Sequence, residues 1–359
     1  MNLGQESTVS PSHGRSPDSD GPTVTPRERF HAVADFAQPD SLPVIEWATW
    51  WDLSIERWRS EGLDPALSGS GLYGALGLDR HDQFWISALA PDCPRPPTHG
   101  APRLQDRAGF RSLSSRLFPK ALPDVASIEA AAQVRDESGS LLWLTFEGFF
   151  WFPRELFGIE PHLLAYYDQK GLMHEMNDRL ADWQLETLER FSEIAVPDFM
   201  TFAEDLSYNL GPMISGDCFE EFLAPYYHRV VPELKKRGIR VIVDSDGDIS
   251  QAIPWFIEAG IEGALPLERQ AGVDVASLRR RFPRFILIGG FDKMVMKHGE
   301  SAMRAEFERL LPSMRLGGYI PSVDHQTPPD VSLANFRIYA GLLREYCERA
   351  SATIAPFSV

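Results

Sequence analysis

The sequence has no uninterrupted apolar run of about 18 residues, the length that a membrane-spanning helix requires, although 43% of its 359 residues are hydrophobic. Its first residues are polar and lack the apolar core of a secretory signal peptide. Cysteine is scarce, and the three present (Cys93, Cys218 and Cys347) are far apart, without the spacing of a disulfide framework or a metal site. These absences predict a cytoplasmic protein with no membrane partner.

Positive charge is also in short supply. The chain has 35 Lys and Arg residues against 51 Asp and Glu residues, for a formal net charge of -16. Such a surface repels the phosphate backbone of nucleic acids. The two basic clusters, 235–237 and 279–281, fall late in predicted helices, where the helix dipole favours cations on a solvated face. We therefore expect no nucleic-acid partner.

The chain begins with a polar segment rich in Pro, Ser and Gly, and we expect residues 1–25 to form a disordered tail. Thr25 and Pro26 then suit the N-cap and the first position of a helix that runs to about Phe36. We expect residues 26–355 to form one domain, of which this helix is an N-terminal extension.

From residue 42 onward, short apolar runs alternate with segments of helical periodicity. This pattern is typical of parallel strands joined by helical crossovers. No glycine-rich phosphate loop follows the first run, which argues against an open dinucleotide-binding sheet. Eight such units close into a (β/α)8 TIM-type barrel, and this α/β fold is our prediction. The expected strand centres lie near residues 44, 85, 143, 200, 241, 265, 287 and 320.

Polar and charged residues follow most of the predicted strands, and in a barrel the carboxyl ends of all strands meet at one mouth. So many carboxylates in one place repel each other unless a metal ion, a cationic substrate or shared protons offset the cost. The residues at these ends are Glu46, Trp47, Glu147, Glu204, Asp205, Asp244, Asp246, Glu268, Lys293 and His325.

Several roles are open to these residues. Asp244, Asp246 and His325 could hold a divalent metal such as zinc, since two carboxylates one residue apart can reach one ion and imidazole adds a nitrogen ligand. His325 could equally act as a general acid or base. Capping of the following helices is the alternative for such acids.

For the remaining strand-end residues we expect catalysis or substrate contact. Glu204, Asp205, His325 and Lys293 are candidates for proton transfer or for pairing with a substrate anion. The aromatic residues Phe149 and Phe150 follow a strand end and could line a pocket, although a packed loop explains them equally well. Glu46, Trp47, Glu147 and Glu268 complete the predicted substrate-binding set.

Three segments resemble the uroporphyrinogen decarboxylase superfamily, which also contains corrinoid-dependent methyltransferases. They are Ser215–Tyr227 (SGDCFEEFLAPYY), Asp244–Asp248 (DSDGD) and Gly317–Asp330 (GGYIPSVDHQTPPD). The openings Thr25–Phe30 and Pro39–Val44 are also similar to it. The resemblance extends over about residues 25–350 and implies a (β/α)8 barrel.

The resemblance separates two activities. Decarboxylases of the superfamily carry an arginine-rich loop after the first strand, whereas the segment Glu46–Asp52 has no arginine and the next one is Arg57. Zinc methyltransferases carry a His-x-Cys-Gly motif and a later cysteine, and here Asp244, Asp246 and His325 fall at or near those positions. This implies metal-assisted methyl transfer from a small methylated substrate to a separate corrinoid protein, because no corrinoid-binding domain is recognised in the sequence.

Two alternatives stay open. A decarboxylase of a porphyrinogen or another small carboxylate would need no cofactor, and Lys293 or Arg269 would hold the carboxylate. A barrel that binds a small molecule without catalysis is the other. A homodimer is the default expectation for oligomeric state, since dimers are the most common oligomers.

Overall fold

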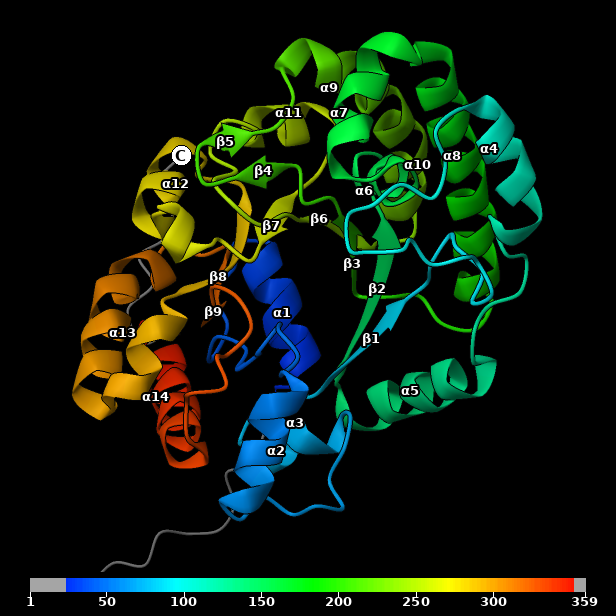
Figure 1. Cartoon of the computed structure of the whole chain (residues 1–359). Coiled ribbons are helices and arrows are strands. Elements are labelled where there is room, and N and C mark those ends of the chain that lie inside the picture. Colours follow the sequence, from blue (N-terminus) through cyan, green and yellow to red (C-terminus); the bar gives the residue numbers. More distant parts are fainter. Residues whose placement is uncertain (1–23, 352–359) are drawn as a thin grey trace, which may run out of the picture.

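The computed structural model describes residues 24–351 (Figure 1). The predicted disordered tail lies outside these residues except for Val24 and Thr25, and residues 352–355 of the predicted domain lie outside them as well. Thr25 caps the first helix as the sequence predicts, because its side chain accepts a hydrogen bond from the Glu28 N–H while the Glu28 carboxylate bonds the Thr25 N–H.

A curved sheet of seven parallel strands forms the centre of the molecule, and its strand order is β1-β2-β3-β6-β7-β8-β9. Helices surround it, from α5 and α8 on one side to α13 and α14 on the other (Figure 1). All neighbours are parallel, so every strand ends at the same edge. The strands are β1 (His81–Trp85), β2 (Leu141–Glu147), β3 (Phe199–Ala203), β6 (Arg240–Asp244), β7 (Gly263–Leu265), β8 (Ile286–Phe291) and β9 (Tyr319–Val323).

Helices alternate with the strands, as the sequence predicts. Pro225 lies in the first turn of α10, so residues 216–236 form two helices, α9 and α10. No helix within residues 24–351 is long and apolar enough to cross a membrane. The helices are α1 (Pro26–Ala34), α2 (Asp52–Ser60), α3 (Gly71–Ala75), α4 (Arg107–Leu113), α5 (Val125–Ser138), α6 (Trp151–Phe157), α7 (Ile159–Asp168), α8 (Lys170–Ser192), α9 (Gly216–Phe222), α10 (Ala224–Lys236), α11 (Ile253–Glu258), α12 (Val275–Arg281), α13 (Glu300–Met314) and α14 (Leu333–Ser351). A small hairpin, β4 (Ser207–Tyr208) and β5 (Gly211–Pro212), follows β3.

The predicted first strand is the one that does not form, so the sheet is open between β1 and β9. Segment 42–48 is buried and extended but lacks regular ladder bonds. Pro43 has no N–H to donate, and the Val44 N–H donates to the Asp79 carboxylate (2.8 Å). The segment is held instead by scattered bonds at both edges, including one from the Trp47 N–H to the Ser322 hydroxyl on β9 (3.2 Å).

Glu46 fixes this segment from within. Its carboxylate accepts hydrogen bonds from the Ser322 hydroxyl on β9 (2.7 Å) and the Tyr339 hydroxyl on α14 (2.8 Å). The residue is fully buried, and this burial raises its pKa to about 7 against the opposing effect of the two hydroxyl donors. A single side chain therefore joins the extended segment, the last strand and the last helix.

Helix α1 lies against the amino ends of the strands. The Phe30 ring packs on Phe199 at the start of β3, with ring centroids 4.9 Å apart. Asp198, the residue before β3, accepts hydrogen bonds from the Arg27 and His31 side chains. Because α1 covers this end of the sheet, the opposite end, where the strands terminate, is the one left for a site.

We expect Glu46→Gln to change the pH dependence of stability. The pKa of Glu46 rises from 4.5 to about 7 on folding, so the folded state keeps the proton longer and the unfolding free energy falls as the pH rises between these values. A shift of this size corresponds to roughly 3 kcal/mol. Urea denaturation at pH 5 and pH 8 should show a smaller loss for Glu46→Gln than for the wild type.

The control is Glu46→Ala, which leaves the buried Ser322 and Tyr339 hydroxyls without their acceptor. It should lose about 2 kcal/mol or more at both pH values, the cost of unpaired buried polar groups. An equal pH dependence in the wild type and Glu46→Gln would contradict the assignment of a buried, proton-binding Glu46.

Candidate active site

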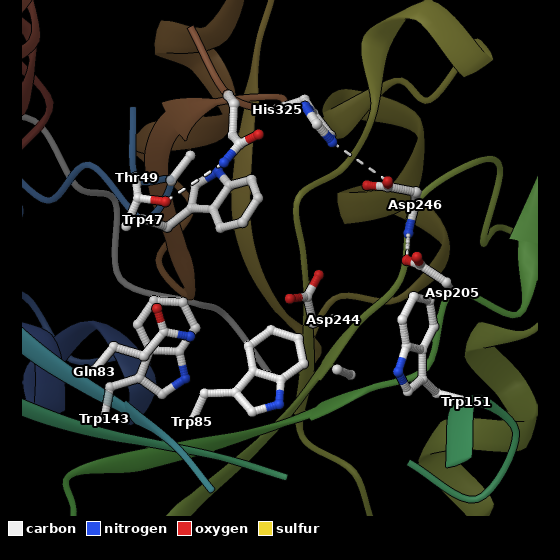
Figure 2. A pocket seen from close by; sticks show the side chains of 13 residues that line it. Trp47, Thr49, Gln83, Trp85, Trp143, Trp151, Asp205, Asp244, Asp246 and His325 are labelled. Atoms are coloured by element: carbon white, nitrogen blue, oxygen red, sulfur yellow. Dashed lines mark hydrogen bonds and ion pairs between the residues drawn. The ribbon is translucent and has the colours of Figure 1, made fainter. Parts of the chain in front are cut away.

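A pocket of about 250 Å³ lies at the carboxyl edge of the sheet (Figure 2). Its walls come from the extended segment 42–48, from residues on β1 and β2, from the ends of β3 and β6, and from residues that follow β2, β3, β6 and β9. This convergence is what parallel strands in a curved sheet produce. The lining residues are Trp47, Ala48, Thr49, Gln83, Trp85, Trp143, Trp151, Ala203, Asp205, Asp244, Asp246, His325 and Gln326.

The floor of the pocket is held by a network of polar side chains on the interior of the sheet. The Trp143 indole N–H donates to the Thr201 hydroxyl (2.9 Å), and the Gln83 amide donates to the Thr145 hydroxyl (2.9 Å). The two threonine hydroxyls bond each other (2.8 Å). The Trp143 ring also stacks on Phe199, with centroids 5.1 Å apart. These bonds fix the orientation of the indole that faces the pocket.

Three aspartates bring negative charge to the pocket. Burial, and then the charge of Asp246, raise the pKa of Asp205 to about 6. Burial and the charges of Asp205 and Asp246 raise the pKa of Asp244 well above its ordinary value. Within residues 24–351 the Asp244 side chain has no hydrogen bond or ion pair, and its carboxylate points into the pocket (Figure 2). The repulsion among these carboxylates is therefore only partly offset by the protein.

Asp205 adopts a backbone conformation that is rare for a residue with a side chain, with φ of 44°. Several bonds hold it there: its N–H donates to the Asp244 carbonyl (3.4 Å), its carbonyl accepts from the Arg154 guanidinium (3.2 Å), and its carboxylate accepts from the Asp246 N–H (3.2 Å). Strained residues that are held in place by several contacts are often found at functional sites. The strain here supports a functional reading of this pocket.

His325 and Asp246 form an ion pair across the mouth, with His325 Nε2 and Asp246 Oδ2 3.4 Å apart (Figure 2). The hydrogen bond to Asp246 raises the pKa of His325, although burial and the charge of Lys293 act in the opposite direction. The imidazole also lies edge-on to Trp47, with ring centroids 6.5 Å apart. A protonated imidazole in this place can donate a proton to a ligand in the pocket.

Glu204, a predicted catalytic residue, does not line the pocket. It is fully buried, and its carboxylate accepts hydrogen bonds from the N–H groups of Phe149 (2.9 Å), Phe150 (2.8 Å) and Trp151 (3.1 Å) and from the Tyr227 hydroxyl. Burial raises its pKa to about 8, while these backbone N–H groups oppose the change. The side chain shapes the loop at the start of α6.

Phe149 and Phe150, predicted to contact substrate, are also packed inside. The Phe149 ring lies 4.9 Å from that of Tyr227, and the Phe150 ring lies 4.6 Å from that of His162. Trp151, the next residue, lines the pocket in their place. The loop therefore presents one of three consecutive aromatic residues to the site and buries the other two.

Lys293 and Glu147 lie outside the lining as well. The Lys293 ammonium donates to the Gln270 side chain (2.7 Å) and pairs with Asp324 (3.5 Å). The Glu147 carboxylate accepts the Ala88 N–H (3.0 Å), and burial raises its pKa. Lys293 is thus paired inside the protein, and Glu147, like Glu46 on the extended segment, is buried and hydrogen-bonded away from the pocket.

Glu268, also predicted to bind substrate, instead supports the turn after β6. Its carboxylate accepts the Gly247 N–H (3.0 Å). Gly247 has φ of 79°, and a Cβ there would lie 2.6 Å from the Tyr208 backbone nitrogen. Only glycine fits this turn against the β4–β5 hairpin, and the turn sets the position of Asp246.

Of the predicted residues, Trp47, Asp205, Asp244, Asp246 and His325 come together at the pocket. The reasoning from sequence missed three residues on neighbouring strands, Gln83, Trp85 and Trp143, and two loop residues, Thr49 and Gln326. One signal could have identified part of this set. Gln83 and Trp85 are two apart on β1, so they share a face, and a glutamine inside a strand marks a polar interior.

The predicted metal ligands do not form a metal-binding arrangement. Across the described part of the chain, no three His, Cys, Asp or Glu side chains gather closely enough to hold an ion. Asp246 and His325 pair with each other, and the Asp244 carboxylate stands apart from that pair (Figure 2). The donor groups that are present therefore do not fit the expected divalent metal.

A pocket at the carboxyl ends of parallel strands in a curved sheet is the arrangement of βα-barrel enzymes. The family profile for uroporphyrinogen decarboxylase (URO-D) matches residues 158–346, a little over half of the chain. The chain belongs to this family. No curated protein matches it in sequence.

Among solved structures, a methyltransferase from Methanosarcina mazei is similar, with a TM-score of 0.66 and 16% identity over 90% of this chain and 99% of that one. At this identity the likeness shows a shared fold. A B12-independent methionine synthase from Shewanella sp. W3-18-1 is less similar, with a TM-score of 0.40 and 13% identity over 62% of this chain and 66% of that one.

We expect natively purified protein to contain no stoichiometric transition metal, because the side chains at the pocket do not converge on one point. Elemental analysis by mass spectrometry of the wild type beside Asp246→Ala measures this directly. Equal, substoichiometric metal in both samples is the expected result. One metal ion per chain in the wild type, lost in Asp246→Ala, would show that the pocket rearranges around an ion.

Proposed function

We propose that this chain is a methyltransferase that takes a methyl group from a small methylated substrate in the pocket and passes it to a separate corrinoid protein. The observation that carries the proposal is the composition of the pocket: three aspartates, one histidine and four tryptophans line about 250 Å³ of space. The fold shared with a methyltransferase from Methanosarcina mazei agrees with it.

The same composition argues against decarboxylation of a porphyrinogen. Such a substrate carries several carboxylates, and no Lys or Arg is among the described residues that line the pocket. The volume also lies below the range of about 300–1,000 Å³ that is usual for ligand pockets. Lys293 and Arg269, the cations that could hold a carboxylate, bond to Gln270 and to the Val273 carbonyl instead.

The side chains at the mouth supply what methyl transfer from oxygen or sulfur requires. The departing atom leaves with an electron pair and is a better leaving group when it is protonated. His325 can donate that proton, and Asp246 stabilises its charged form at 3.4 Å. The tryptophan walls exclude water from the methyl group. The corrinoid partner accepts the methyl group.

Exposed apolar residues near the pocket are consistent with binding of a separate corrinoid protein. Trp85 lines the pocket and is also half-exposed, and Tyr208 and Leu210 of the β4–β5 hairpin are exposed beside the turn at Gly247. A methyl acceptor that docks here would reach the bound substrate.

The proposal predicts methyl transfer to free, reduced cobalamin used in place of the partner. We expect the wild type to methylate it from at least one member of a panel of methoxy, methylthio and methylammonium compounds, followed by the absorbance of the corrinoid. His325→Ala should slow transfer from an oxygen or sulfur donor by about 100-fold, the size of a general acid contribution.

Asp248→Asn is the matched control, since Asp248 lies outside the pocket lining and its carboxylate accepts the Ser250 N–H (2.9 Å). It should leave the rate unchanged. Uroporphyrinogen should not be consumed by the wild type. Its decarboxylation at an enzyme-like rate, with no methyl transfer from any donor, would refute the proposal and favour the cofactor-free decarboxylase.

A further inference from the structure

Indole rings form part of the wall of the pocket. Four of the nine tryptophans in the chain line it: Trp47, Trp85, Trp143 and Trp151. Two are fixed by hydrogen bonds, from the Trp47 indole N–H to the Val323 carbonyl (2.6 Å) and from the Trp143 indole N–H to the Thr201 hydroxyl. Their polar atoms are therefore occupied. Trp143 is 1% exposed and stacks on Phe199, so the ring surface open to a ligand comes mainly from the other tryptophans.

The charges around these rings are negative. Asp205, Asp244 and Asp246 line the pocket, and His325 is the only cationic group among the described lining residues. The Asp244 carboxylate points into the pocket (Figure 2). Arg154 is the nearby exception: it stacks on the Trp151 ring at 4.9 Å and donates to the Asp205 carbonyl, but it does not line the pocket.

We propose that the ligand of this pocket is a small methylated ammonium compound, quaternary or tertiary, and that it is the methyl donor. The second part rests on the function proposed above. Aromatic ring faces attract cations, and cages of aromatic residues recognise quaternary ammonium groups. The three carboxylates add attraction, and a bound cation offsets their mutual repulsion.

The distribution of charge on the ligand distinguishes an organic ammonium ion from a metal ion at this site. A quaternary ammonium has no hydrogen to donate and spreads its charge over methyl groups, so it suits ring faces better than directed hydrogen-bond acceptors. A divalent metal ion would need several oxygen ligands around one point, and no such group forms within residues 24–351. A small organic cation fits both the walls and the volume.

Methyl transfer from an ammonium donor needs no proton from a general acid. The bond between nitrogen and the methyl carbon breaks, and nitrogen keeps the electron pair. The acceptor supplies both electrons of the new bond to carbon. The donor loses its positive charge in this step and leaves as a neutral amine.

Isothermal titration calorimetry of the full chain at low salt tests the binding directly. The probes are choline and tetramethylammonium, with the neutral carbon analogue of choline and magnesium chloride as comparisons. We expect the ammonium compounds to bind at least tenfold more tightly than the neutral analogue, because that analogue keeps the shape and loses the charge. Equal binding of the neutral analogue, or binding of magnesium alone, would overturn the inference.

Two pairs of variants assign the site. Trp85 and Trp51 are equally exposed, at 48% and 49%, but only Trp85 lines the pocket. Trp85→Leu should weaken choline binding about tenfold, a typical cation–π contribution, and Trp51→Leu should not. Asp244→Asn should weaken it similarly, while Asp248→Asn should not. Equal effects within either pair would show that the cation binds elsewhere.

The assay separates the two proposals. Binding of choline without transfer to cobalamin from any donor would retain the cation site and refute the methyltransferase. Transfer from neutral methoxy or methylthio donors, with no binding of ammonium compounds, would retain the methyltransferase and refute the cation site. Transfer from choline that Trp85→Leu slows and Trp51→Leu leaves unchanged supports both.

Discussion

The site depends on keeping three carboxylates around one small cavity without a lysine or arginine among the described residues that line it. Backbone bonds make this possible. The Asp246 N–H donates to the Asp205 carboxylate, and the Asp244 carbonyl accepts the N–H groups of both Glu204 and Asp205. The strained Asp205 is the result of these bonds. The protein thus positions the charges through its main chain and leaves their attraction available to a ligand.

The acidic side chains at the strand ends have two different roles. Glu46, Glu147, Glu204 and Glu268 each accept hydrogen bonds from loops or neighbouring elements, and none lines the pocket. Asp324, after β9, acts in the same way, because its carboxylate accepts the Arg269 and Lys293 N–H groups (2.9 and 3.0 Å). Asp205, Asp244 and Asp246 line the cavity instead. Some acidic residues at the strand ends therefore stabilise the surrounding loops, and the others line the pocket.

The sequence predicted the strands well where apolar runs were uninterrupted, as in Leu141–Glu147. The predicted strand at Leu42–Trp47 is wrong, because Pro43 has no N–H to donate and the Val44 N–H bonds to a side chain instead of to a neighbouring strand. Asp205, Asp244, Asp246 and His325 line one pocket, as expected of residues that follow parallel strands, because the carboxyl ends of such strands lie at the same edge of the sheet. Which of Phe149, Phe150 and Trp151 faces the pocket depends on where α6 begins, which is a tertiary property.

The open seam between β1 and β9 has a consequence for specificity. Trp47, Ala48 and Thr49 form part of the pocket wall, yet segment 42–48 shares no ladder with either neighbouring strand. A wall built this way can change in length or composition without shifting the register of the sheet. Related chains could therefore acquire new substrates at this seam while the seven-stranded frame stays constant.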